Sequence, residues 1–236
     1  MNGNESLEFA EEFDSVDSSA SLSVALGAQC PAPFLSERRW NDLMSQYKLP
    51  NCRDIFDQLT SAYAQRHRAY HTASHVNECL SHLDAIEPLP VRPQEIEMAL
   101  WFHDAIYKPR STKNETDSAN WCVEFMQSQL IEEPTIARIE QLITVTAHNR
   151  LPNTLDEFLI TDIDLSILGA ESKRFAEYDE AIRFEYKWVP NLLYKRKRKQ
   201  VLENFLARES LYHLEYFTSR YEQQARDNLK EAIAKL

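Results

Sequence analysis

The stretch "EIEMALWFHDAIY", residues 95–107, has the apolar spacing of a helix and two polar residues where that helix should be buried. At 3.6 residues per turn, His103 falls on the same face as Ile96 and Leu100. A single histidine on such a face is usually a hydrogen-bonded core residue. Asp104 follows directly, however, and a buried carboxylate needs a cationic partner or a metal ion. The stretch therefore predicts a buried helix with either a structural ion pair or a metal site.

Signals for helix starts recur along the chain. Ser36 and Thr154 are suited to cap helices, and the "TLDE" that begins at Thr154 has the spacing of a capping box. Pro93 and Pro134 suit first helical turns, and Gly169 suits a helix end. The chain has only three glycines in 236 residues and no alternating runs between tight turns. We expect an all-α fold, a single helical bundle of roughly eight to ten helices.

The N-terminal segment, residues 1–34, differs in composition from the rest. Residues 1–37 hold seven acidic residues and no lysine or arginine, which leaves 30 acidic against 26 basic residues elsewhere. We expect residues 1–34 to be a flexible acidic tail and residues 35–236 to form one domain. A net charge of −11 disfavours nucleic-acid or membrane partners, so a small soluble substrate is expected.

The cysteines and the N-terminus indicate the compartment. Cys30, Cys52, Cys79 and Cys122 form no C-x-x-C pair, so neither a zinc ribbon nor a disulfide framework is indicated. The acidic start resembles neither a secretory nor a transit signal. The uncharged residues 18–36 are too rich in Ser, Ala, Gln and Pro to insert into a membrane. We expect a cytoplasmic protein.

A second buried helix with acidic residues is predicted at "FLITDIDLSILG", residues 158–169. Apolar residues lie nearly all round it, yet it carries Asp162 and Asp164. No lysine or arginine lies between Leu151 and Lys173, so the compensating charge must come from elsewhere. A metal ion or distant arginines could supply it. Residues two apart on a helix point to roughly opposite sides, so only one of the two aspartates should face a metal.

A third stretch, "RAYHTASHV" at residues 68–76, places His71 and His75 at a spacing that can share one helical face. It is not a zincin motif, because the interior "TAS" lacks the glutamate base. Imidazoles from this stretch, the His–Asp doublet and a later aspartate form a mixed donor set. Such a set accepts Mn, Mg, Fe, Ni, Co or Zn and leaves positions open for water and substrate.

The ordered pattern H…HD…D, carried by His75, His103 with Asp104, and Asp164, resembles the HD-domain superfamily of metal-dependent phosphohydrolases. The segments "YHTASHV", "WFHDAIY", "NETDSA", "DIDLSILG", "IRFEY" and "VLENFLARESLY" are similar, in this order, to a branch of uncharacterised predicted HD phosphohydrolases. The resemblance spans roughly Leu35 to the C-terminus. It implies an HD-type helical domain at 35–236 and a divalent metal ion held by the four residues of the pattern.

The resemblance also implies individual roles. In the related cyclic-nucleotide phosphodiesterases, the second histidine of "YHNxxH" binds metal and the first protonates the leaving oxygen. By this likeness His75 is a metal ligand and His71 a candidate proton donor, although Thr72 stands in place of the asparagine. The alternative for His71 is a helix-entry residue bonded to a neighbouring carboxylate. The match at "DLS" favours Asp164 over Asp162 as the last ligand.

Further candidates are open to two interpretations each. Glu115 is a candidate base next to the metal ligands. Alternatively, it only places a negative charge at a helix start that Asn114 caps. His148 is either a second-metal ligand or a histidine at a helix C-terminus. Arg198, in the run "KRKRK" at 195–199, is a candidate phosphate contact or part of a solvated helix face. The remaining histidines are predicted to be structural or surface residues: His67, His82 and His213.

The predicted function is metal-dependent hydrolysis of a phosphate ester or anhydride, of a nucleotide or related small molecule, by metal-activated water. One alternative is an HD-fold di-iron oxygenase, which extra ligands such as His148 would favour. Another is a non-catalytic HD module that binds a ligand. The sequence specifies neither the substrate, nor the metal and the number of ions, nor the oligomeric state.

Overall fold

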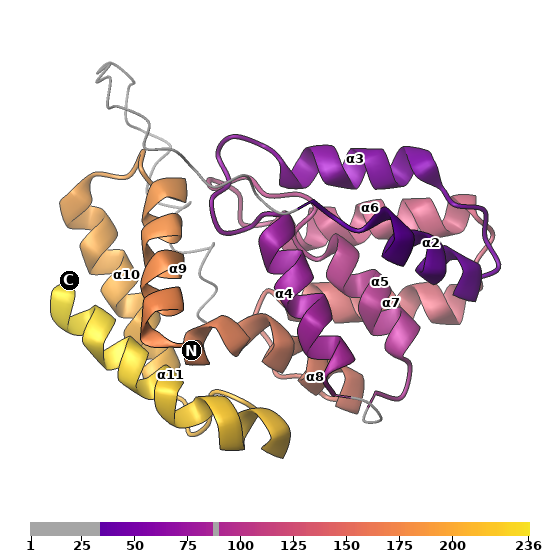
Figure 1. The fold of residues 1–236 in the computed structure, drawn as a ribbon. Helices are drawn as coiled ribbons and strands as arrows, with labels where there is room; N and C mark the ends of the chain where they lie inside the picture. Colours follow the sequence, from indigo (N-terminus) through magenta and orange to yellow (C-terminus); the bar gives the residue numbers. More distant parts are fainter. Residues whose placement is uncertain (1–33, 87–89) are drawn as a thin grey trace.

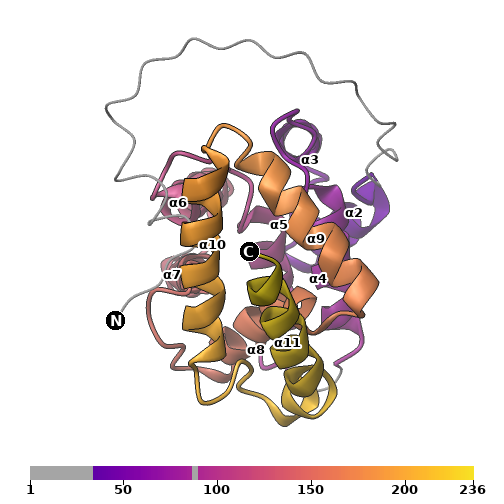
Figure 2. The ribbon, with the colours of Figure 1, turned by 90° about the vertical axis from the view of Figure 1, so that its left-hand side faces the viewer.

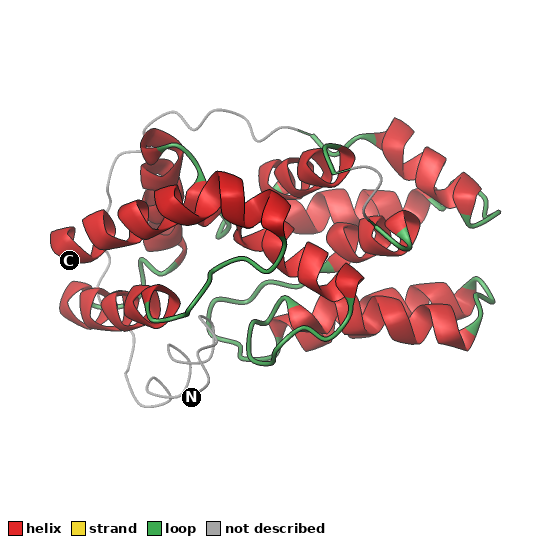
Figure 3. Ribbon diagram, turned by 90° about the horizontal axis from the view of Figure 1, so that it is seen from below, coloured by secondary structure: helices red, strands yellow, loops and turns green. Residues whose placement is uncertain are grey.

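The computed structural model describes residues 34–86 and 90–236. These residues form ten α-helices and one 3-10 helix and contain no strand (Figure 3), which confirms the predicted all-α class. The predicted tail lies outside the described residues except for Phe34. None of the described helices is both long and apolar enough to cross a membrane.

The helices follow one another with short connections. In chain order they are α2 (Glu37–Gln46), α3 (Arg53–Tyr63), α4 (Ala73–Asp84), α5 (Pro93–Phe102), α6 (Asn114–Ser128), α7 (Glu133–Val145), α8 (Leu155–Asp164), the 3-10 helix η1 (Leu165–Gly169), α9 (Ser172–Glu185), α10 (Asn191–Leu206) and α11 (Glu215–Lys235).

Local sequence explains where several helices begin. The Ser36 hydroxyl accepts a hydrogen bond from the Arg39 amide at the start of α2. The Thr154 hydroxyl accepts one from the Glu157 amide at the start of α8. Prolines occupy the first turns of α5 and α7, where the missing N–H has no helical partner to lose. These starts match the predicted ones.

Helix α5 lies at the centre of the domain and packs against α2, α4, α6, α7 and α8. The sequence predicted one buried face, but Met98, Trp101 and Phe102 are buried as well because neighbours surround the helix. Trp101 packs edge-on against Trp40 of α2, with ring centroids 5.3 Å apart. Such a pair stabilises a core by about 0.5–1.5 kcal/mol beyond burial. The core therefore holds the C-terminal end of α5, and the His–Asp doublet after it, in a fixed place.

Two groups of helices make up the molecule. Helices α2–α7 lie together, and α9, α10 and α11 form the other end (Figure 1), which Figure 2 shows face-on. Between them η1 packs against α9 and α11. The sequence suggested one helix through residues 158–169, but α8 ends at Asp164 and η1 continues from Leu165. A Cβ on Gly169 would lie 2.5 Å from the Tyr221 Cβ, so glycine lets α11 approach η1.

Candidate metal centre

Each predicted ligand lies at or near the end of a helix. His75 is in the first turn of α4, and Asp164 is the last residue of α8. His103 caps the C-terminus of α5, and Asp104 follows in the turn rather than on the helix. His71 lies in the turn before α4, so it does not share a helical face with His75. Helix ends and turns thus bring together side chains that the sequence placed on helix faces.

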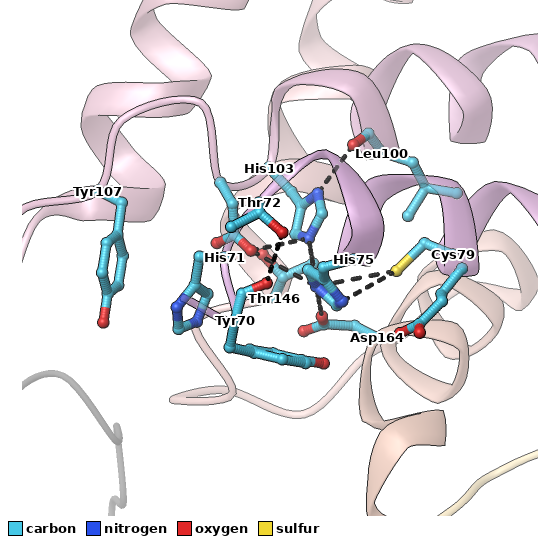
Figure 4. Close-up of polar contacts among 12 residues, drawn as sticks. Tyr70, His71, Thr72, His75, Cys79, Leu100, His103, Tyr107, Thr146 and Asp164 are labelled. Carbon is cyan, nitrogen blue, oxygen red and sulfur yellow. Dashed lines mark hydrogen bonds and ion pairs between the residues drawn. The ribbon is translucent and has the colours of Figure 1, made fainter. Parts of the chain in front are cut away.

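The four predicted ligands converge at one point. Figure 4 labels three of them, His75, His103 and Asp164. The His75 Nε2 atom lies 3.1 Å from His103 Nε2, 3.1 Å from Asp164 Oδ1 and 3.5 Å from Asp104 Oδ2. The His103 Nε2 atom lies 3.1 Å from Asp104 Oδ2 and 3.7 Å from Asp164 Oδ1. Both histidines are buried and both carboxylates largely so.

This spacing fits a single ion. Donors about 2.0–2.2 Å from one metal in adjacent positions lie about 3–3.5 Å apart. The hydrogen bond of the other His103 ring nitrogen is also consistent with metal binding through Nε2. The Nδ1–H group donates to the Leu100 carbonyl oxygen at 2.9 Å. That hydrogen bond directs the Nε2 lone pair toward the other donors, an arrangement common behind metal-bound histidines. The donor set is therefore suited to a divalent metal.

Cys79 lies beside the cluster, one helical turn after His75 on α4. His75, Cys79, His103 and Asp164 form a buried group whose ligand atoms all lie within 4.8 Å of one another and that could hold a metal ion. The Cys79 Sγ is 3.7 Å from Nδ1 and 3.8 Å from Nε2 of His75. Being almost equidistant from both nitrogens, the sulfur lies off the axis of either lone pair, so it packs against the ring.

Opposite charges in the cluster stabilise each other. Burial alone would lower the pKa of His103, but the Asp104 charge and hydrogen bond, with Asp164, raise it to about 9. Burial opposes ionisation of Asp104 and Asp164, yet the neighbouring histidines hold both carboxyl pKa values well below their usual range. The carboxylates are therefore ionised and ready to bind a cation, whereas a metal must displace the His103 proton.

His71 is held next to the cluster by a buried glutamate of α9. Its Nδ1–H donates to Glu185 Oε2 at 2.7 Å, and Glu185 Oε1 accepts the backbone amides of residues 69–71 at 2.7, 2.8 and 3.1 Å. The Tyr107 hydroxyl donates to Glu185 Oε2 at 2.8 Å, and its ring stacks on His71 with centroids 4.1 Å apart. Burial would lower the pKa of His71, but the charges of Glu185 and Asp104 raise it to about 9.

A buried arginine links the turn that contains His71 to the turn that contains Asp104. Arg68 donates to the carbonyl oxygens of His71 at 3.0 Å, Asp104 at 2.6 Å and Ala105 at 2.8 Å. Because one planar guanidinium contacts both turns, it fixes the backbone of His71 relative to that of Asp104. Its charge also lies close to the acidic residues of the site.

A small cavity of about 80 Å³ opens beside the cluster. The predicted residues that line it are His71, Asp104, Glu115, His148 and Asp164. Apolar and aromatic side chains form the rest of the wall: Tyr70, Leu165, Ile167, Leu168, Tyr178 and Phe205, with Thr146 and Ala147. A larger groove of about 540 Å³ runs along α3 and residues 105–108, but none of the predicted site residues lines it.

Glu115 and His148 both line the cavity. Burial raises the pKa of Glu115, which lies in the first turn of α6. Asn114 does not cap that helix as expected, because Lys113 is the N-cap and the Asn114 amide bonds instead to the backbone of Lys108. His148 follows α7 with a φ of 53°, a strained conformation for a non-glycine residue, and its Nε2 lies 2.9 Å from Asp164 Oδ2.

Asp162 lies away from the donor cluster. Its carboxylate accepts the amides of His213 and Leu214 and pairs with the His213 imidazole at 2.8 Å. It therefore anchors the segment before α11. His67 contacts the Tyr107 carbonyl, and His82 packs near Phe217.

Arg198 does not line the cavity. It is buried, bonds to Asp179 at 3.0 Å and lies over the ring of Tyr178. The basic run 195–199 is therefore not uniformly solvated, because Arg198 is buried whereas Arg196 is exposed.

Two contributors were missed by sequence reasoning. Glu185 belongs to the "IRFEY" segment that carried the resemblance, but it bonds to residues 114–116 positions earlier, and no local pattern indicates such a contact. Cys79 has the i+4 spacing from His75 that places both on one face of α4, and this signal was available.

No family model matches the chain, and no curated protein or solved structure matches it either. The HD resemblance therefore stays a prediction from the quoted segments.

Proposed function

We propose that this protein is a metal-dependent phosphohydrolase of the HD type, acting on a small phosphorylated molecule. The observation that carries the proposal is the convergence of four donors, His75 Nε2, His103 Nε2, Asp104 Oδ2 and Asp164 Oδ1, separated by 3.1–3.7 Å along the five measured pairs. These atoms belong to the pattern H…HD…D, and the two aspartates among them line a cavity.

The chain's residues have distinct roles in this proposal. A divalent metal, when bound, would acidify a water molecule and neutralise phosphoryl charge. His71 would donate a proton to the leaving oxygen, because Glu185 holds its Nδ1–H and its pKa of about 9 keeps it protonated at neutral pH. Glu115, which lines the cavity, would accept a hydrogen bond from a water molecule or from a substrate hydroxyl.

Metal binding can be tested independently of the substrate. We expect excess Mn²⁺ to raise the melting temperature of the metal-free protein by about 5–10 °C at a hundred times the Kd, from mass action. His103→Ala and Asp104→Ala should lose this rise. His82→Ala is the matched control, since His82 lies outside the cluster and should leave the rise intact.

Hydrolysis is tested on the metal-loaded protein with a panel of phosphate esters and anhydrides. The parent and His82→Ala should release inorganic phosphate, and the two ligand variants should not. A different result would instead indicate a buried structural cluster. In that case no divalent ion would change the melting temperature of the parent, and the ligand variants would unfold.

One contact favours the oxygenase alternative. The two oxygens of Asp164 face different histidines, with Oδ1 at His75 and Oδ2 at His148, as a carboxylate bridging two ions would. Two irons per chain and oxygen consumption without phosphate release would support an oxygenase. Phosphate release by protein holding any other divalent metal would support the hydrolase.

A further inference from the structure

The cavity beside the cluster has acidic residues but no lysine or arginine in its wall. The 26 lysines and arginines of the chain all fall within the described residues, because residues 1–33 and 87–89 contain none. None of the 26 lines the cavity, whereas Asp104, Glu115 and Asp164 do. One divalent ion would offset two of these three carboxylates, and the His71 imidazole is already paired with Glu185, so the wall offers no fixed positive charge to a long polyanion.

Two arginines pack against aromatic residues of the cavity wall. The Arg198 guanidinium carbon is 5.3 Å from the ring centroid of Tyr178, and that of Arg208 is 4.5 Å from the centroid of Phe205. Both rings line the cavity and neither arginine does. Neither arginine therefore presents its guanidinium to a phosphate in the cavity.

The small volume of the cavity also disfavours a long phosphate chain. Its volume of about 80 Å³ is well below the roughly 300–1,000 Å³ of pockets that enclose whole ligands. A cavity of this size suits a single phosphoryl group rather than a chain of several.

We propose that the site accepts one terminal phosphoryl group, so that it selects phosphate monoesters over di- and triphosphates, with Glu115 as the residue that sets this preference. This selectivity rests on the proposed function and narrows its substrate class. Asp104 and Asp164 belong to the donor cluster, so Glu115 is the one lining carboxylate left to face a second phosphate of a longer chain. Its carboxylate repels that phosphate, and it can accept a hydrogen bond from a hydroxyl of a monoester instead.

Coulomb repulsion sets the scale of the effect. At an effective dielectric constant near 20 and a separation of about 6 Å, one additional like charge weakens binding about a hundredfold. We expect kcat/KM for a nucleoside 5′-monophosphate to exceed that for the triphosphate of the same base by about that factor.

The test compares these two substrates at saturating free Mn²⁺, with equilibrium binding of inorganic phosphate and pyrophosphate as a second readout. Glu115→Gln removes the charge and keeps the shape, so it should reduce the mono- to triphosphate ratio by about tenfold or more. The same substitution should also increase the affinity for pyrophosphate relative to that for phosphate. Glu124→Gln, an exposed change of the same kind on α6, should leave both ratios within about twofold of the parent.

The outcomes separate the two proposals. Equal use of mono- and triphosphate by the parent, or an unchanged ratio in Glu115→Gln, overturns the selectivity and leaves the hydrolase standing. Selective binding of phosphate over pyrophosphate without any hydrolysis supports the selectivity and overturns the hydrolase. Neither hydrolysis nor phosphate binding overturns both.

Discussion

Replacing Glu185 with glutamine should remove the charge that keeps His71 protonated. The carboxamide oxygen can still accept the three backbone amides of residues 69–71. Its NH₂ group, however, would face two donors, the Nδ1–H of His71 and the hydroxyl of Tyr107. His71 must then present an unprotonated Nδ1, so its pKa falls and the proton moves to Nε2.

The size of the effect follows from the pKa of His71. A rise from 6.5 to about 9 is equivalent to about 3 kcal/mol, since one pKa unit corresponds to about 1.4 kcal/mol. The His71 side chain is 19% exposed, so solvent screening leaves about 2 kcal/mol. Because the folded-state pKa is raised, this contribution is complete below pH 6.5 and is lost as pH rises through 9.

Glutamate 185 contributes over a different range. Burial would raise its pKa, but His71 and the backbone amides lower it from 4.5 to about 2. Its contribution is complete above pH 4.5 and is lost as pH falls through 2, outside the range where His71 titrates.

The assay is urea unfolding of metal-free protein, followed by circular dichroism, at several pH values from 6 to 9.5. Between these limits the parent should lose about 1–2 kcal/mol more stability than Glu185→Gln, because Asp104 still raises the pKa of His71 in the variant. The pKa of His103 is also raised to about 9, but this residue is present in both proteins and cancels in the difference. Parallel stability curves for the two proteins would refute the assignment of the His71 charge to Glu185.

Three further predictions concern single substitutions. Asp164→Asn should abolish metal binding, measured by isothermal titration, whereas Asp162→Asn should keep it and lower the unfolding free energy, because Asp162 anchors the segment before α11. Gly169→Ala should destabilise the fold by about 1–3 kcal/mol in urea unfolding, because its Cβ would collide with Tyr221. Arg198→Ala should lower stability by about 2 kcal/mol, because the buried guanidinium loses its ion pair with the partly exposed Asp179, yet leave the KM for phosphate esters unchanged.

The sequence predicted the helices better than it predicted the positions of the site residues. Helix starts depend on neighbours a few residues apart, and the Ser36 and Thr154 caps were readable for that reason. Periodicity indicated that residues near His103 are buried, but not that α5 stops at Phe102 and leaves Asp104 in a turn. The contact between Glu185 and the His71 turn depends on how α9 packs, which no local pattern encodes.

The walls of the cavity come from both groups of helices, but none of the four candidate metal donors belongs to α9, α10 or α11. His75, His103, Asp104 and Asp164 belong to α4, the end of α5 and α8, whereas Tyr178 and Phe205 come from α9 and α10. Substitutions at these two wall residues can therefore reshape the cavity without replacing a donor atom. The donor cluster and the shape of the cavity beside it can thus change independently of each other.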